Sequence, residues 1–257
     1  GVKAEGVGRI GFVILAGEVD QYAASLPQIL ERLVDALRST QADGAVVHHN
    51  VLLCFRILLL RVSPRSLASF WPVAISELMR ILKLGHSPSV APALVYPALR
   101  FLDLAILLQP EEFQVMQWAF MMGLTALINR GEEGGGELVS EGVSERRTDS
   151  DAIPDGDACP SGDVTDVTGD VTGDVLGDVT ALGRPALWRV RVESRAELVE
   201  AARVVRAAAR KMDSGGVGET DVGFITAQLR HELDEVAWDS TVGGGAGTSL
   251  GAGASSL

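Results

Sequence analysis

The stretch Val46–Met79, VVHHNVLLCFRILLLRVSPRSLASFWPVAISELM, decides the fold. Its first half is apolar on almost every face, because only Arg56 and Arg61 interrupt the run between Val51 and Val62. Such a helix is buried between neighbouring helices or crosses a membrane. A span needs about 20 largely apolar residues, and Arg56 lies in the middle of this run. We therefore predict a buried helix, with both arginine stems along apolar surface and both guanidinium groups in water.

Ser63 and Pro64 mark the corner after this helix. Ser63 can cap a second helix, and Pro64 suits its first turn because the missing N–H would be unpaired there anyway. Pro72 falls inside the helical pattern that follows, so we expect a kink or a break near Trp71. The whole stretch thus predicts two packed helices joined by a sharp turn.

Further helices are predicted on both sides of this pair. Residues 26–38 show an amphipathic pattern, and residues 93–108 show another apolar helix with Pro97 close to its start. Pro110 followed by Glu111 and Glu112 indicates a helix start, since carboxylates favour the positive end of the helix dipole. These helices have short connections marked by proline, which is typical of helical arrays.

The N-terminal and C-terminal parts have weaker patterns. The apolar run 10–15 fits either a strand or the end of a helix. Ser194 and Glu197 form a capping box ahead of an apolar stripe that reaches Met212. Residues 221–238 predict one more helix.

We therefore expect an all-α fold, a HEAT/armadillo-like helical array or bundle, without a strict repeat period. The chain does not begin with Met, and we expect it to be a piece of a longer protein. The predicted organisation is a helical domain over 1–130, a disordered acidic linker over 131–187, a two-helix segment over 188–240 and a disordered Gly/Ala/Ser tail over 241–257.

The net charge of −12 is concentrated in the predicted linker, whose residues 131–187 hold 3 basic and 14 acidic side chains. The flanking regions have no concentrated positive field, which argues against nucleic-acid binding. The helix after Ser194 carries basic residues that could contact an anionic membrane surface, although a solvated helix face is the preferred interpretation. These residues are Arg203, Arg206, Arg210 and Lys211.

The sequence contains no assembled catalytic or metal site. His48 and His49 are adjacent, so on a helix their side chains point about 100° apart and cannot chelate one ion together. Cys54 lies in the most apolar helix, where burial raises a thiol pKa and blocks access. With Cys159 as the only other cysteine, a reducing compartment such as the cytosol is favoured. We predict no enzyme, no cofactor, no metal ligand and no small-molecule substrate.

The tract DVTDVTGDVTGDVLGDVT at residues 163–180 repeats aspartate at short intervals. Regularly spaced carboxylates can hold a cation weakly, and one hypothesis is therefore a calcium-responsive protein. The period does not match the nine-residue calcium-binding repeat. A disordered acidic linker is the preferred interpretation.

Three segments in order, LPQILERLVDALR (26–38), VLLCFRILLLRVSPRSLASFWPVAISELM (51–79) and RFLDLAILLQPEEFQVMQWAF (100–120), resemble the C-terminal region of the Dopey family. The resemblance implies a large eukaryotic cytosolic protein, peripheral on Golgi, trans-Golgi-network and endosome membranes. It implies a non-catalytic scaffold or adaptor in vesicle-mediated protein transport between these compartments. The implied partners are a Mon2-type large scaffold and a phospholipid-flipping P4-type ATPase. The helical pattern alone also allows a generic helical-repeat protein-binding module unrelated to trafficking.

Overall fold

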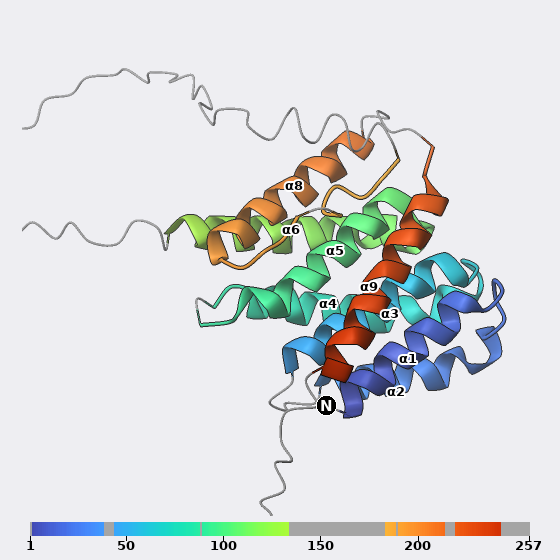
Figure 1. Ribbon diagram of the computed structural model, residues 1–257. Coiled ribbons are helices and arrows are strands. Elements are labelled where there is room, and N and C mark those ends of the chain that lie inside the picture. Colours follow the sequence, from blue (N-terminus) through green and yellow to red (C-terminus); the bar gives the residue numbers. More distant parts are fainter. Residues whose placement is uncertain are drawn as a thin grey trace, which may run out of the picture.

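The computed structural model describes residues 2–38, 44–87, 89–133, 183–188, 190–213 and 219–242, without the side chains at some helix ends. These residues form α-helices and two short 3-10 helices, and none of them lies in a strand (Figure 1). The all-α prediction is confirmed, and the N-terminal apolar run belongs to a helix. The helices are α1 (Val2–Ala16), α2 (Leu26–Arg38), α3 (Gly44–Arg61), α4 (Phe70–Leu84), α5 (Pro92–Leu108), α6 (Glu111–Glu133), α8 (Arg195–Asp213) and α9 (Val222–Val242).

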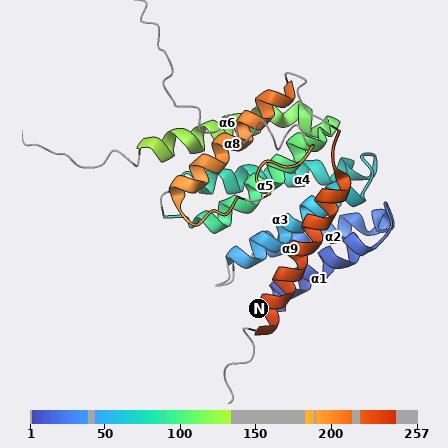
Figure 2. The same cartoon turned by 45° about the horizontal axis from the view of Figure 1, so that its top comes forward.

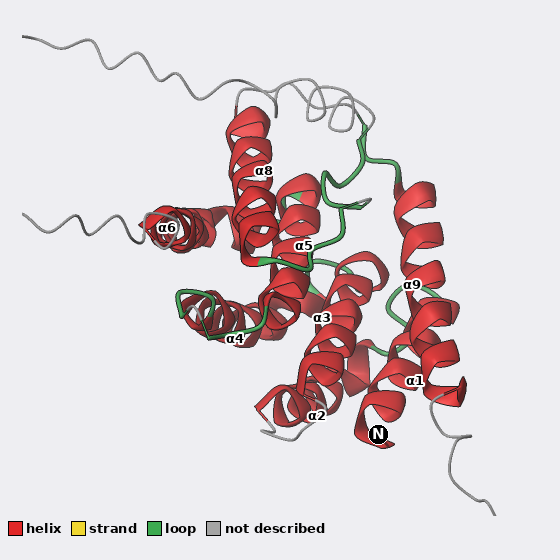
Figure 3. Cartoon of the chain, turned by 60° about the vertical axis from the view of Figure 1, so that its left-hand side comes forward, coloured by secondary structure: helices red, strands yellow, loops and turns green. Residues whose placement is uncertain are grey.

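The helices pack in two rows. In one row α1 contacts α3, α3 contacts α5 and α5 contacts α8. In the other row α2 contacts α4 and α4 contacts α6, while α2 with α3, α4 with α5 and α6 with α8 join the rows (Figure 3). The last helix, α9, runs alongside α1 and α3 on the outside of the first row (Figure 2). This arrangement confirms the predicted helical array.

Helix α3 is the centre of the core. Its residues from Val51 to Leu59 are all buried. By length and apolar composition α3 could also cross a membrane, and most of its residues are covered by the rest of the fold. The prediction that Arg56 holds its guanidinium in water is wrong, because this residue is only 4% exposed. Arg61 is half-buried and donates a hydrogen bond to the carbonyl of Gly17.

The corner after α3 differs from the prediction in detail. Ser63 does not start an α-helix, because a 3-10 helix, Ser66–Ser69, comes first and α4 begins only at Phe70. Pro72 consequently lies in the first turn of α4, where it removes no helical hydrogen bond. The break predicted near Trp71 thus lies just ahead of Phe70. Asp20 fixes the corner from outside, since its Oδ1 accepts the Ser63 N–H at 2.7 Å.

Aromatic side chains fill the space between α3, α4, α5 and α6. The ring of Phe55 packs edge-on against Phe70 at 5.1 Å and against Phe101 at 6.3 Å between centroids. Trp71 contacts Phe113, whose ring stacks on that of Phe120 at 5.5 Å. Offset and edge-on pairs of this kind add to the stabilisation from apolar burial. The rings therefore join both rows into one core.

Three predicted helix starts are seen at the atomic level. At α8 the N–H of Glu197 donates to Ser194 Oγ at 3.2 Å, and the Ser194 N–H donates to Glu197 Oε2 at 2.9 Å. This is the predicted capping box. Helix α6 begins at Glu111 directly after Pro110, as predicted. At α9 the Asp221 Oδ1 accepts the N–H of Phe224 at 2.9 Å, which satisfies a free donor of the first turn.

The last residues of the predicted linker, from 183 onward, and the segments after it join the core of the first helices. Residues 183–188 and 190–192 form a strap along α5, with Leu187 fully buried. Helix α8 packs on α5 and α6, and α9 packs on α1 and α3. Most of the predicted linker (residues 134–182, including the aspartate tract and Cys159) and nearly all of the predicted tail (243–257) lie outside the described residues.

Candidate functional site

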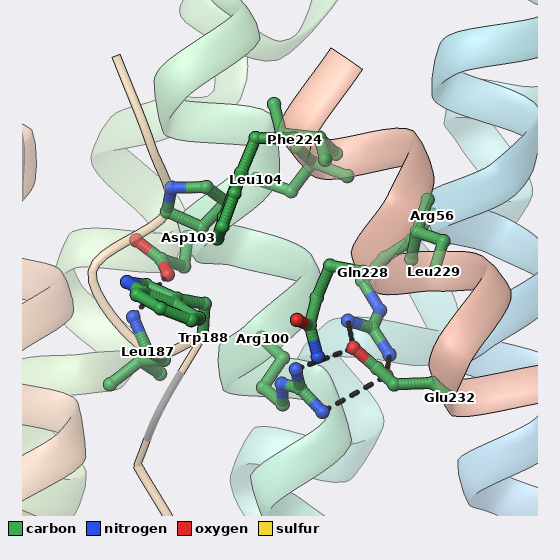
Figure 4. A pocket seen from close by; sticks show the side chains of 12 residues that line it. Arg56, Arg100, Asp103, Leu104, Leu187, Trp188, Phe224, Gln228, Leu229 and Glu232 are labelled. Carbon is green, nitrogen blue, oxygen red and sulfur yellow. Dashed lines mark hydrogen bonds and ion pairs between the residues drawn. The ribbon is translucent and has the colours of Figure 1, made fainter. Parts of the chain in front are cut away.

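A buried cluster of charges lies where α3, α5 and α9 meet (Figure 4). Glu232 of α9 is 4% exposed, and two arginines converge on its carboxylate. Arg56 of α3 donates from Nη2 to Oε2 at 2.5 Å and from Nη1 to Oε1 at 3.3 Å. Arg100 of α5 donates from Nη2 to Oε1 at 2.6 Å and from Nη1 to Oε2 at 3.0 Å. Each guanidinium group therefore binds the carboxylate through two hydrogen bonds, the bidentate geometry that arginine favours.

The charges of this cluster depend on one another. Burial alone would raise the pKa of Glu232, but the positive charges of Arg56 and Arg100 lower it to about 2. Burial lowers the pKa of Arg56, yet an arginine stays charged in proteins. Removing one partner of a buried ion pair leaves an uncompensated charge, which is strongly destabilising. Glu232 is thus the counter-ion that allows two arginines to lie inside the fold.

Asp103, one turn from Arg100 on α5, holds the strap. Its Oδ2 accepts the backbone N–H of Leu187 at 2.7 Å. The hydroxyl of Tyr96, two turns earlier on α5, donates to the carbonyls of Leu187 and Val190. Burial raises the pKa of Asp103 to about 6, although the N–H groups of Leu187 and Ala186 lower it in part. The strap is therefore held on α5 by the Asp103 carboxylate, which accepts a hydrogen bond from it, and by the Tyr96 hydroxyl, which donates to it.

The raised pKa of Asp103 predicts a pH dependence of stability. The folded-state pKa of Asp103 lies above the ordinary 3.8. Protonated Asp103 therefore contributes its full share to the free energy of unfolding below about pH 4, and this contribution is lost as the pH rises through 6. Asp103→Asn removes this titration. Between pH 5 and 7 the wild type should therefore lose about 1 kcal/mol of unfolding free energy relative to the variant. Urea denaturation of both proteins at several pH values measures the difference.

The difference between the two proteins isolates Asp103 from other groups. Burial lowers the pKa of His49 to about 4 and also lowers that of His48. Both histidines add stability as the pH rises, in the wild type and the variant alike. Glu232 titrates at lower pH in both. Parallel stability curves for the two proteins would contradict the assignment.

A pocket of about 550 Å³ opens beside the charge cluster, between α1, α3, α5 and α9. Asn50, His49 and Arg100 contribute polar groups to its wall. Asn50 is 1% exposed and donates from Nδ2 to the carbonyl of Ala4 at 2.9 Å, while its Oδ1 meets no donor among the described residues. The His49 imidazole is neutral at pH 7 because burial lowers its pKa. These groups can form hydrogen bonds, but they include no nucleophile beside a base.

The residues considered as catalytic candidates lie apart. Cys54 is fully buried, and burial raises the pKa of its thiol to about 12, which keeps it protonated. His48 meets the carbonyl of Leu37 at 2.8 Å through Nε2. His231 lies on the exposed face of α9. Within the described ranges, no group of three or more His, Cys, Asp or Glu side chains could hold a metal ion.

The basic residues of α8 lie on its outer side. The apolar stripe of α8 is buried, as predicted, through residues such as Ala202 and Val205. Arg203 donates to Glu200 at 2.9 Å, and Arg210 is exposed. The contact of this face with an anionic membrane stays a prediction.

Helix α6 carries an exposed apolar stripe at the edge of the array. Val115 is 72% exposed, Trp118 is 64% exposed and Met122 is 66% exposed. Steps of three and four residues place all three on one helix face. The opposite face is buried through Phe113, Phe120 and other residues. A stripe of large apolar side chains in water is a feature of protein interaction surfaces.

Sequence reasoning missed the pairing of Arg56 with Glu232, which lie 176 residues apart. A local signal was present, because Glu232 follows Ile225 by seven residues and therefore falls on the apolar stripe of its helix. A carboxylate on the apolar face of one helix and an arginine inside another apolar helix are both expected to be buried. Because buried charges are paired, the two side chains are expected to form an ion pair. Nothing in the sequence indicated that Arg100 would complete the cluster.

Two rows of packed helices, with a buried charge cluster between the first row and α9, define a helical-array protein. The family model described as DOP1 C-terminal matches residues 2–154. This match covers more than half of the chain, and the chain therefore belongs to the DOP1 C-terminal family, the Dopey family that the three sequence segments resembled.

Individual relatives agree with this assignment. Mouse protein DOP1B is 32% identical over 154 residues, which covers 46% of this chain and 7% of that protein. Protein pad-1 of Caenorhabditis elegans is 32% identical over 142 residues, covering 48% of this chain and 6% of that protein. The DOP1 homolog of Drosophila melanogaster is 42% identical over 73 residues, covering 28% and 3%. The chain thus spans less than a tenth of these relatives. No solved structure matches it.

Proposed function

We propose that this chain is a non-catalytic helical scaffold in vesicle-mediated protein transport between the Golgi and endosomes, and that it binds protein partners through the exposed stripe of α6. Membership of the DOP1 C-terminal family supports the trafficking role. The partners proposed are those implied by the Dopey resemblance, a Mon2-type large scaffold and a phospholipid-flipping P4-type ATPase. The proposed location is the cytosolic face of Golgi, trans-Golgi-network and endosome membranes.

The α6 stripe is the observation that carries the binding role. Val115, Trp118 and Met122 expose apolar surface that water solvates poorly. Tryptophan at the centre of such a stripe is typical of the residues that dominate binding energy at protein interfaces. Helix α6 also lies within the family match, so the stripe belongs to the part of the chain shared with the relatives.

Trp118→Ala is expected to weaken partner binding by a factor of about 30 or more, because a central tryptophan contributes about 2 kcal/mol or more to an interface. Since Trp118 is 64% exposed, the melting temperature should change little. The measurement is the affinity of the purified chain for the Mon2-type scaffold and, separately, for the flippase. Imaging of the tagged protein in the source cells tests the location.

Phe12→Ala is the matched control, because Phe12 is also a largely exposed aromatic residue but lies on α1, far along the array from α6. It should leave the affinity unchanged. Equal affinities for the Trp118 variant and the wild type would remove the stripe from the interface. A diffuse protein that binds neither partner would argue instead for a helical-repeat module outside trafficking.

A further inference from the structure

Helix α9 lies on the array with a single apolar face. Ile225, Leu229 and Leu233 are buried together with Glu232, while Arg230, His231, Asp234 and Glu235 are exposed. This pattern is that of an amphipathic helix laid along a groove. The walls of the groove are α1, α3 and α5, which face α9 with Gly8, Gly11, Arg56 and Arg100.

Gly11 of α1 allows α9 to pack close to α1 and α3. A Cβ atom at Gly11 would lie 3.2 Å from Leu233 Cδ2 and 2.9 Å from Cys54 Sγ, so a larger residue would push α9 or α3 away. A Cβ atom at Gly8 would lie 3.6 Å from Val236 Cγ1, in ordinary contact. The groove is thus shaped for a helix at short distance.

The floor of the groove selects a carboxylate. Arg56 and Arg100 place two guanidinium groups at one point, with side-chain exposures of 5% and 12% when α9 is in place. A helix without an acidic residue at that point would bury both charges unpaired. An amphipathic helix with one carboxylate in its apolar stripe fits both the shape and the charge.

The family match covers the three helices that wall the groove but does not extend to α9, which occupies it. The helices α1, α3 and α5 lie inside the family match to residues 2–154, whereas α9 begins at Val222. Helix α9 also reaches the groove only after the long segment 134–182 and α8.

We propose that this groove is a receptor for an acidic amphipathic helix of a partner protein, and that α9 occupies it in cis as the competitor of that partner. The two arginines recognise the central carboxylate of the incoming helix, and the apolar walls bind the residues one turn on each side. This site is separate from the α6 stripe, so the two proposals stand or fall independently.

A labelled peptide of residues 219–242 is the probe, and the chain of residues 1–257 is the receptor. Fluorescence anisotropy measures binding to the wild type and to two chain variants, Glu232→Gln and Leu233→Ala, that weaken the cis helix by different means. Because cis occupancy lowers the apparent affinity of a competitor, both variants should bind the wild-type peptide about tenfold or more tightly than the wild-type chain does. Circular dichroism confirms that each variant is folded.

Changes in the peptide test the carboxylate. A Glu232→Gln peptide should bind either variant about 30-fold or more weakly than the wild-type peptide, because it leaves the arginines unpaired. A Glu235→Gln peptide is the matched control, since that side chain is 63% exposed, and its affinity should be unchanged.

Three results would overturn the proposal. The first is equal binding of the wild-type and Glu232→Gln peptides. The second is no peptide binding by either folded variant, or unfolding of both variants, which would make α9 an integral part of the core. The third is a dimer of the variant chains that the peptide dissociates, which would identify a second copy as the occupant of the groove. Light scattering with and without the peptide measures the oligomeric state of the variant chains.

Discussion

Glu232→Gln is expected to lower the free energy of unfolding by about 3–5 kcal/mol, because it leaves two buried guanidinium groups without their counter-ion. Arg56 and Glu232 have side-chain exposures of only 5% each, so water cannot replace the lost charge. The amide of glutamine can still accept one hydrogen bond, but it carries no charge. Urea denaturation at pH 7, monitored by circular dichroism, measures the change.

Glu5→Gln is the matched control for this loss of one carboxylate. Glu5 pairs with Arg9 one turn away on α1, and the two side chains are 45% and 78% exposed. Exposed pairs of this kind contribute at most about 1 kcal/mol. Similar losses for Glu5→Gln and Glu232→Gln would show that the buried cluster is no more important to stability than a surface pair.

Phe55→Ala is expected to cost about 3–5 kcal/mol of unfolding free energy, because it opens a cavity at the centre of the aromatic core. Phe55 is fully buried and contacts Phe70 and Phe101 edge-on. Both neighbours are themselves fixed by other rings, so the cavity cannot easily collapse. For a chain of this size the loss corresponds to a melting temperature lower by roughly 6–20 °C, measured by calorimetry.

Phe12→Ala separates burial from aromatic character. Phe12 is 52% exposed on α1, and its truncation should change the unfolding free energy by no more than about 0.5 kcal/mol. A small effect for Phe55→Ala, comparable to that of Phe12→Ala, would contradict the central place of Phe55 in the core.

Local patterns in the sequence predicted most of the helices. The amphipathic spacing predicted α2 over 26–38, and Ser194 with Glu197 predicted the start of α8, because both signals involve neighbours along the chain. Pro110 marked the start of α6 for the same reason. The corner at Ser63 was less predictable, since Asp20 from a distant segment holds it. Family membership followed from three segments taken together, which no single helix could have supported.

The candidate sites depend on contacts that span the chain. Arg56 was expected to reach water, because the sequence does not show that α9 returns to cover it. The exposure of Trp118 likewise depends on α6 lying at the edge of the described array, whereas its sequence pattern resembles that of a buried helix. Which helices border a given face is a property of the tertiary arrangement, and periodicity alone does not contain it.

The separation of 176 residues between Arg56 and Glu232 has a consequence for biosynthesis. A ribosome adds about 5–20 residues per second, so Arg56 leaves the exit tunnel roughly 10–35 seconds ahead of its counter-ion. Throughout that interval Arg56 has no Glu232 to pair with, and Arg100 is in the same state once α5 has been translated. The charge cluster can therefore assemble only after Glu232 has left the ribosome, so the burial of Arg56 beside a counter-ion is a late step of folding.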